Sequence, residues 1–151
     1  MKRIAYCGFF IGLLLALPIH AQSSQTEALL TPQALAHADG EQIFRHICQG
    51  CHMADAHGAT GAGNYPALAG DANLASADFV AATLLFGRRN MPAFGPRPDL
   101  QGWDAFLHVD LSDAQIASVV NYVRGHFGNR YSGQLTAAEV AALHPATPRK
   151  P

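Results

Sequence analysis

Apolar residues recur along much of the chain with the three- to four-residue spacing that is typical of α-helices. The first such stretch predicts a helix from about Pro32 to Cys48, because proline is favoured near a helix start and the apolar positions share one side. A second stretch predicts a helix over 76–86. Gly87 is expected to close it, since glycine is the preferred residue just past a helix end.

The C-terminal third of the chain predicts two more helices. One opens at Ser112, where Gln115 completes a capping box, and is expected to end near Gly128. Its apolar positions follow the helical period: Ile116, Val119, Val120, Val123 and Phe127. A short helix over 136–145 opens at a second capping box and stops at a proline. No stretch alternates with period two, so the pattern predicts an all-α domain.

The first 21 residues have the composition of a secretory signal peptide. Lys2 and Arg3 form a basic start, an apolar run extends from Ile4 to Leu17, and a small residue, Ala21, precedes a polar stretch. The run is shorter than the ~20 residues that a membrane span needs. We therefore expect cleavage after Ala21 and a periplasmic location. Retention of the run as an N-terminal anchor is the alternative.

These boundaries divide the chain into a signal peptide (1–21), a linker (22–31), one domain (32–131), and a C-terminal appendage and tail (132–151). The end of the tail is rich in proline and is expected to lack regular structure. Outside the signal peptide no segment is long and apolar enough to span a membrane, so no span is expected after cleavage.

The composition is that of a compact domain with an apolar core. Of the 151 residues, 49% are hydrophobic and only 14% are charged. Ten basic residues face eleven acidic ones, which is far from the positive balance that binding to a phosphate backbone needs. Nucleic acid is therefore not expected as a partner.

Two cysteines remain after removal of the signal peptide, within the pentapeptide Cys48-Gln49-Gly50-Cys51-His52. Three kinds of site contain such a pair: a redox dithiol, half of a zinc or iron–sulfur site, and a covalent haem attachment. A thioredoxin-like dithiol needs a preceding strand, whereas a helix is predicted here. A zinc or iron–sulfur site needs further thiolates, and no second cysteine pair exists. The C-x-x-C-H pattern favours attachment of one haem c.

In such a site the thiols of Cys48 and Cys51 add to the vinyl groups of the haem, and the adjacent His52 is placed to bind the iron. Methionine sulfur opposite histidine is the usual arrangement in electron carriers. Met1 leaves with the signal peptide and Met53 directly follows His52, so Met91 is the candidate for the second axial ligand. Pro92 favours an extended conformation at Met91, which suits a loop laid over a flat ligand.

Two histidines compete with Met91 for this role, because histidine is a stronger iron ligand. They are His57 and His108. A core position for Met91 is the other alternative.

Four motifs occur in order: 48–52 (CQGCH), 64–70 (NYPALAG), 90–94 (NMPAF), and 111–113 (LSD) leading into 119–124 (VVNYVR). In this order they resemble the class I cytochromes c. More narrowly, the chain is similar to monohaem cytochrome c subunits or domains that accompany periplasmic dehydrogenases of bacteria. The match covers about Gln33 to Tyr131. It implies three core helices wrapped around one covalently bound haem, with a short C-terminal helix added.

The resemblance also assigns roles to particular residues. It implies that the backbone carbonyl of Pro66 binds the outer nitrogen of His52. Tyr65, Arg88 and Trp103 are candidates for hydrogen bonds to the haem propionates; a surface or core position without haem contact is the alternative for each.

The resemblance further implies a close crossing of the first and last core helices. Gly40 and Phe44 are expected to meet Val119, Tyr122 and Val123 there.

The segment from Gly95 to Asp110 is longer than the family pattern. It contains Trp103, Phe106 and His108. Two interpretations are open: a docking element for a partner beside the exposed haem edge, or a loop that only shields the haem.

The pattern as a whole predicts a periplasmic carrier of single electrons with His/Met-ligated, low-spin haem iron, and no enzymatic activity of its own. Its redox partners would be a periplasmic dehydrogenase or a respiratory complex as donor and an oxidase or reductase as acceptor. One alternative is a dedicated electron-transfer subunit of a stable dehydrogenase complex. Another is a haem enzyme or gas sensor with an open iron site.

Overall fold

A computed structural model describes residues 31–61 and 63–145 of the 151-residue chain. The predicted signal peptide, nearly all of the predicted linker and the end of the predicted tail lie outside these residues. Within the described ranges no helix has the length and apolar character needed to cross a membrane.

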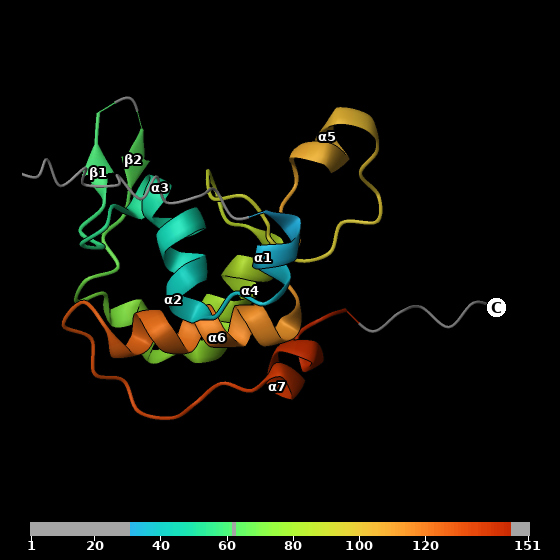
Figure 1. Cartoon of the computed structure of the whole chain (residues 1–151). Coiled ribbons are helices and arrows are strands. Elements are labelled where there is room, and N and C mark those ends of the chain that lie inside the picture. Colours follow the sequence, from blue (N-terminus) through green and yellow to red (C-terminus); the bar gives the residue numbers. More distant parts are fainter. Residues whose placement is uncertain (1–30, 62, 146–151) are drawn as a thin grey trace, which may run out of the picture.

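Helices dominate the described part of the chain (Figure 1). In chain order the elements are α1 (Pro32–Ala36), α2 (Gly40–Ile43), the π-helical turn η1 (Phe44–Cys48), α3 (Gln49–His52), β1 (Ala59–Thr60), β2 (Asn64–Tyr65), the 3-10 helix η2 (Ala72–Ala75), α4 (Ala77–Phe86), α5 (Gly102–Leu107), α6 (Asp113–Gly125) and α7 (Ala137–Ala142). The two short strands pair as an antiparallel hairpin, which the sequence pattern did not predict. The hairpin is too short to alter the helical class of the domain.

The predicted helix from Pro32 to Cys48 is wrong in its boundaries. The chain turns between α1 and α2, and a new helical run starts at Gly40 and continues through η1 and α3 to His52. Asp39 causes this break, because it forms a capping box with Gln42. The Asp39 carboxylate accepts from Gln42 N at 2.9 Å, and Gln42 Oε1 accepts from Asp39 N at 3.0 Å.

The other predicted helices are confirmed with small changes at their ends. Ser76 caps α4, and Gly87 follows it with a positive φ of 72°. Ser112 and Gln115 form the expected capping box of α6. This helix ends at Gly125, three residues before the predicted end, because Phe127 and Gly128 both take positive φ angles. The helix α7 also begins with its predicted capping box.

A close crossing of α2 and α6 organises the core. A Cβ atom at Gly40 would overlap the Ser118 carbonyl and lie only 2.9 Å from Cβ of Tyr122, so only glycine permits this approach. Next to it, the ring of Phe44 lies 5.8 Å from that of Tyr122 and 4.6 Å from that of Phe127. The implied contacts of Gly40 and Phe44 with Tyr122 are thus confirmed.

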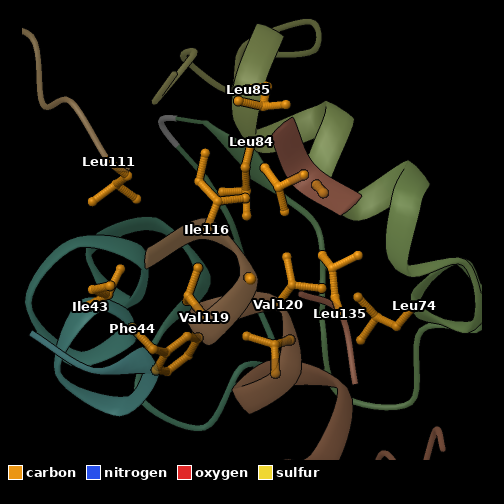
Figure 2. Packing of buried hydrophobic residues seen from close by; sticks show 14 of the residues in the cluster. Ile43, Phe44, Leu74, Leu84, Leu85, Leu111, Ile116, Val119, Val120 and Leu135 are labelled. Carbon is orange, nitrogen blue, oxygen red and sulfur yellow. The ribbon is translucent and has the colours of Figure 1, made fainter. Parts of the chain in front are cut away.

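The apolar face of α6 forms the centre of the buried cluster. Figure 2 shows Val119 beside Phe44 and Ile43, with Val120 and Ile116 reaching toward Leu84 and Leu135. α7 closes one side of this cluster with the fully buried Val140, and His144 Nε2 lies 2.7 Å from Asp113 Oδ1 at the start of α6. The C-terminal appendage therefore belongs to the folded unit.

Two buried polar side chains hold the loops around α6. Asn129 accepts from Gly70 N at 2.9 Å and donates to the carbonyls of Leu68 and Val123. Arg124 is only 5% exposed and donates to three backbone carbonyls, those of Leu74, Ser132 and Gly133. Because a buried polar group must find partners, these bonds fix the 68–74 loop against the end of α6.

The Gly40→Ala substitution is expected to lower the free energy of unfolding by about 1–3 kcal/mol, because the added methyl group forces α2 away from α6. Thermal unfolding of the matured protein measures this. The control is Gly125→Ala, since a Cβ there meets nothing within 4 Å and alanine favours a helix. Equal stability of the two variants would contradict the packing described here.

Candidate functional site

The Cys48–His52 segment ends the helical run that starts at the α2–α6 crossing. It begins at the last residue of η1, where π-helical bonding spans one more residue than in an α-helix and turns the next side chains relative to those before. Phe44, at the start of η1, remains in the core, whereas Cys51, seven residues later, is exposed. Turns of this kind occur often at functional sites. The sequence pattern did not predict this one.

His52 is buried, with 8% of its surface exposed, and its ring is held by one specific bond. Its Nδ1 lies 2.9 Å from the carbonyl oxygen of Pro66, as the resemblance implied. A carbonyl only accepts hydrogen bonds, so Nδ1 must carry the proton. The lone pair is then on Nε2, which has no hydrogen-bond partner among the described residues. The ring therefore presents one basic nitrogen in a set orientation.

The loop that carries Pro66 is built around Gly58, which sequence analysis did not single out. Gly58 N donates to the His52 carbonyl at 3.0 Å, and its φ is +69°. A Cβ atom there would overlap the carbonyl of Tyr65 and lie 2.8 Å from the Pro66 oxygen. The glycine is therefore required for the Pro66 carbonyl to reach His52. Several glycines lie in this stretch, so composition alone does not show which of them matters.

The two cysteines have different surroundings, and both are free thiols in this structure. Cys51 is exposed, whereas Cys48 packs against the apolar cluster. Burial raises the pKa of the Cys48 thiol to about 12, so its sulfur stays uncharged over the physiological range. An apolar environment that disfavours a thiolate suits a neutral thioether equally well.

Met91 lies in a separate loop, at the end of a tight turn. Arg88 and Met91 exchange two backbone hydrogen bonds of 3.0 Å, and Arg89 between them has a φ of 55°. The turn begins at Gly87, where a Cβ atom would lie 2.9 Å from the Met91 carbonyl. Met91 itself is partly buried and packs against the core cluster. The position of this thioether therefore depends on the backbone of the turn.

Three residues were also expected to contact the haem propionates: Tyr65, Arg88 and Trp103. Tyr65 is in β2 and 37% exposed, and the Arg88 guanidinium lies 5.6 Å from the ring centre of Phe79. Trp103 is on α5 and 77% exposed. In the described part of the chain no side-chain hydrogen bond, ion pair or ring contact joins Tyr65, Arg88 or Trp103 to His52 or to Met91.

The competing histidines have other partners. His108 Nε2 lies 3.0 Å from the Gly95 carbonyl and 3.1 Å from Asp110 Oδ1. His57 is exposed, and its Nδ1 lies 3.0 Å from the Asp55 carbonyl oxygen. His108 Nε2 is thus engaged, whereas His57, like His52, is held through Nδ1 and keeps Nε2 without a hydrogen-bond partner among the described residues. In residues 31–61 and 63–145 there is also no group of three or more His, Cys, Asp or Glu that could hold a metal ion.

Comparison with known protein families identifies the family to which this chain belongs. Residues 35–123 match the family model described as "Cytochrome C oxidase, cbb3-type, subunit III". The chain belongs to the cytochrome c family. This match covers the helical run, the Cys48–His52 segment, the Met91 turn and most of α6.

Three curated relatives of this cytochrome c family chain are cytochrome subunits of dehydrogenases. The "Fructose dehydrogenase cytochrome subunit" of Gluconobacter japonicus is 32% identical over 73% of the chain and 22% of its own length. The "Alcohol dehydrogenase (quinone), cytochrome c subunit" of Gluconobacter oxydans is 31% identical over 79% of the chain and 24% of its own length. The "Gluconate 2-dehydrogenase cytochrome c subunit" of Pantoea cypripedii is 31% identical over 69% of the chain and 23% of its own length. The chain thus spans about a quarter of each relative or less.

Membership of the cytochrome c family implies a haem c cofactor, and the residues present fit this group. The chain offers two free thiols three residues apart, a histidine with one available nitrogen, and a thioether in the separate Met91 turn. Sulfur and imidazole donors of this kind are the ones that hold haem iron in electron carriers.

The Gly58→Ala substitution is expected to lower the free energy of unfolding by about 1–3 kcal/mol more than Gly70→Ala does. The two glycines have nearly the same φ, +69° and +67°, so backbone strain is matched. Only Gly58 has the Pro66 loop within contact distance, whereas a Cβ at Gly70 meets nothing within 4 Å. Thermal unfolding of the matured protein gives the comparison. Equal losses in the two variants would show that the loop does not depend on the close approach.

Proposed function

We propose that this chain is a monohaem electron-transfer cytochrome without catalytic activity of its own. Its haem c is attached through Cys48 and Cys51, and His52 and Met91 bind the iron from opposite sides. The observation that carries the proposal is the His52–Pro66 hydrogen bond of 2.9 Å, which leaves only Nε2 available as a ligand. When bound, the haem supplies a one-electron couple.

Each residue has a distinct task in this proposal. Pro66 orients the His52 ring through the Nδ1–H bond and thereby selects Nε2 as the ligand atom. Met91 supplies a thioether, which raises the reduction potential relative to a second nitrogen ligand. A ligand set that does not change on reduction keeps the structural rearrangement small, which favours fast electron transfer. The apolar contacts of Cys48 and Met91 add burial, another determinant of the potential.

Two further residues are proposed to face the haem propionates: Tyr65 and Arg88. Arg88 is attached to the Met91 turn by the backbone bonds described above, and Tyr65 precedes Pro66 in the chain. Both therefore belong to loops that carry a proposed ligand or its partner. Trp103 lies on the longer 95–110 segment, and its role depends on where α5 lies relative to the cofactor.

The relatives favour a dehydrogenase as the electron donor. All three belong to dehydrogenases as cytochrome subunits, so we propose that this chain takes single electrons from such an enzyme and passes them to an oxidase or reductase. The proposal places this electron transfer in the periplasm, after cleavage of residues 1–21. The same names support the alternative of a dedicated subunit in a stable dehydrogenase complex rather than a free carrier.

The substitution Met91→Ala tests the ligand assignment. The visible spectrum of the oxidised, periplasmically matured protein is expected to contain the weak far-red band of an iron–methionine bond, and the variant is expected to lack it. The reduction potential of the variant is also expected to fall, because a sulfur ligand stabilises the reduced iron. The control is Met53→Leu, which changes a methionine on the His52 side and is expected to keep the band.

Two results would contradict this assignment. A wild-type protein without the band would favour His108 or His57 as the ligand. Binding of carbon monoxide to the reduced wild-type protein without denaturant would favour the open-site haem enzyme or sensor.

The double substitution Cys48→Ala with Cys51→Ala tests the attachment. The wild-type polypeptide is expected to keep its haem on a denaturing gel stained for haem peroxidase activity, and the double variant is expected to lose it completely. Each single variant retains one thiol and is expected to keep a reduced amount of stain. Haem that stays with the double variant would rule out thioether bonds at these positions.

A further inference from the structure

The helix α5 carries an exposed apolar surface that no described residue covers. Trp103, Phe106 and Leu107 are 77%, 75% and 71% exposed, and we call these three side chains the α5 patch. No residue of α5 is buried, and Figure 1 shows the helix standing away from α2, α4 and α6. Single exposed apolar residues are common, but adjacent large ones of this kind mark interaction sites.

The α5 patch has the arrangement of a helical anchor. Its residues have the i, i+3 and i+4 spacing that places side chains on one face of a helix. The Trp103 and Phe106 rings already contact each other edge to face, with centroids 5.5 Å apart. Trp is also among the residues that most often dominate binding energy in an interface. This face therefore resembles the apolar side of a helix that docks into a groove.

The base of the 95–110 segment is attached to the loop that contains Met91. Gly95 N donates to Leu85 O at 3.2 Å, and Leu111 N donates to Phe94 O at 2.8 Å. His108 Nε2 lies 3.0 Å from the Gly95 carbonyl and closes the base from the other side. The base of the segment is thus held beside the end of the Met91 loop, and the α5 patch begins twelve residues after Met91.

We propose that the α5 patch docks into an apolar groove, rimmed by basic side chains, on the dehydrogenase subunit that delivers electrons to this chain. The proposal rests on the proposed function and names the surface through which the donor is recognised.

The size of the patch supports a redox partner over a second copy of this chain. Large aromatic side chains bury about 150–250 Å² each, so three side chains exposed to this degree offer roughly 400–500 Å². A stable dimer needs about 800 Å² from each partner. Encounters between redox proteins are smaller, with less than ~1,200 Å² in total, and an anchor of this size fits that class.

The charge around the α5 patch indicates which charge the rim of the partner's groove should carry. The segment 96–110 contains Asp99, Asp104 and Asp110 but only one arginine. That residue, Arg97, is already paired with Asp99 through contacts of 2.7 and 2.8 Å. Asp110 in turn lies 3.1 Å from His108 Nε2, which leaves Asp104, on α5 itself, as the carboxylate of this segment without an ion pair among the described residues. The segment keeps a formal charge of −2 with His108 neutral, so basic side chains on the partner would speed association at low salt.

The test compares the matured wild-type protein with a Phe106→Ser, Leu107→Ser double variant. The probe is the dehydrogenase that co-purifies with the wild-type chain from its source organism, reduced by its substrate, and stopped-flow absorbance follows reduction of the haem. The second-order rate constant is expected to fall about tenfold or more in the variant. The wild-type rate is expected to fall as ionic strength rises. Phe86→Ser is the control, because Phe86 is 52% exposed on α4, outside the patch, and is expected to keep the wild-type rate.

Spectrum, reduction potential and reduction by dithionite separate this proposal from the proposed function. All three are expected to be unchanged in the double variant. Equal rates for variant and wild type would overturn the docking proposal while leaving the proposed function intact. An altered spectrum or potential would show that α5 covers the haem instead, and a wild-type dimer that the variant loses would show self-association; either result overturns the proposal. If dithionite reduces the matured wild-type protein but the dehydrogenase does not, both the docking proposal and the proposal of a dehydrogenase as electron donor are contradicted.

Discussion

The close approach of α2 and α6 at Gly40 is the constraint on which the rest of the structure depends. Backbone contact at this point brings the ring of Phe44 against Tyr122 and Phe127 and aligns the apolar face of α6 with the start of the helical run. Since the Cys48–His52 segment ends that same run, its position follows from the crossing. The core thus places one half of the candidate site through rigid helices rather than through loops.

The two halves of the site are built differently. His52 belongs to the helical run and is oriented by the Pro66 carbonyl, which reaches it only because Gly58 allows the loop to come close. Met91 instead depends on a hydrogen-bonded turn between Gly87 and Phe94 that is anchored to the end of α4. In the proposed function, these separate supports would hold the two ligands on either side of the haem without a continuous wall of secondary structure.

Buried polar groups connect these supports to the core. Asn129 and Arg124 bind the carbonyls of the loop that follows Pro66, so α6 fixes both the helical run and the loop that orients His52. Unpaired, each of these groups would cost several kcal/mol in the interior, so the loop positions are tied to the stability of the whole domain. The 95–110 segment is the exception, because α5 stands outside this network and offers its apolar residues to a partner.

Local signals in the sequence determined much of this protein. The capping boxes at Ser112 and Thr136 and the glycine after α4 each depend on neighbouring residues, and they were predicted with the correct positions. The 48–52 motif is likewise local, and its role in haem attachment stays a prediction. The break at Asp39 was a local signal that sequence analysis missed, because its capping box with Gln42 joins residues three apart. The helix over 102–107 was missed as well, and it has no buried residue. Tertiary structure decided the π-helical turn and the role of Gly58. These two features depend on contacts between residues distant in sequence. Periodicity in the sequence shows which face of a helix is apolar. The close approach of another backbone decides at which positions, such as Gly40 and Gly58, no residue other than glycine fits.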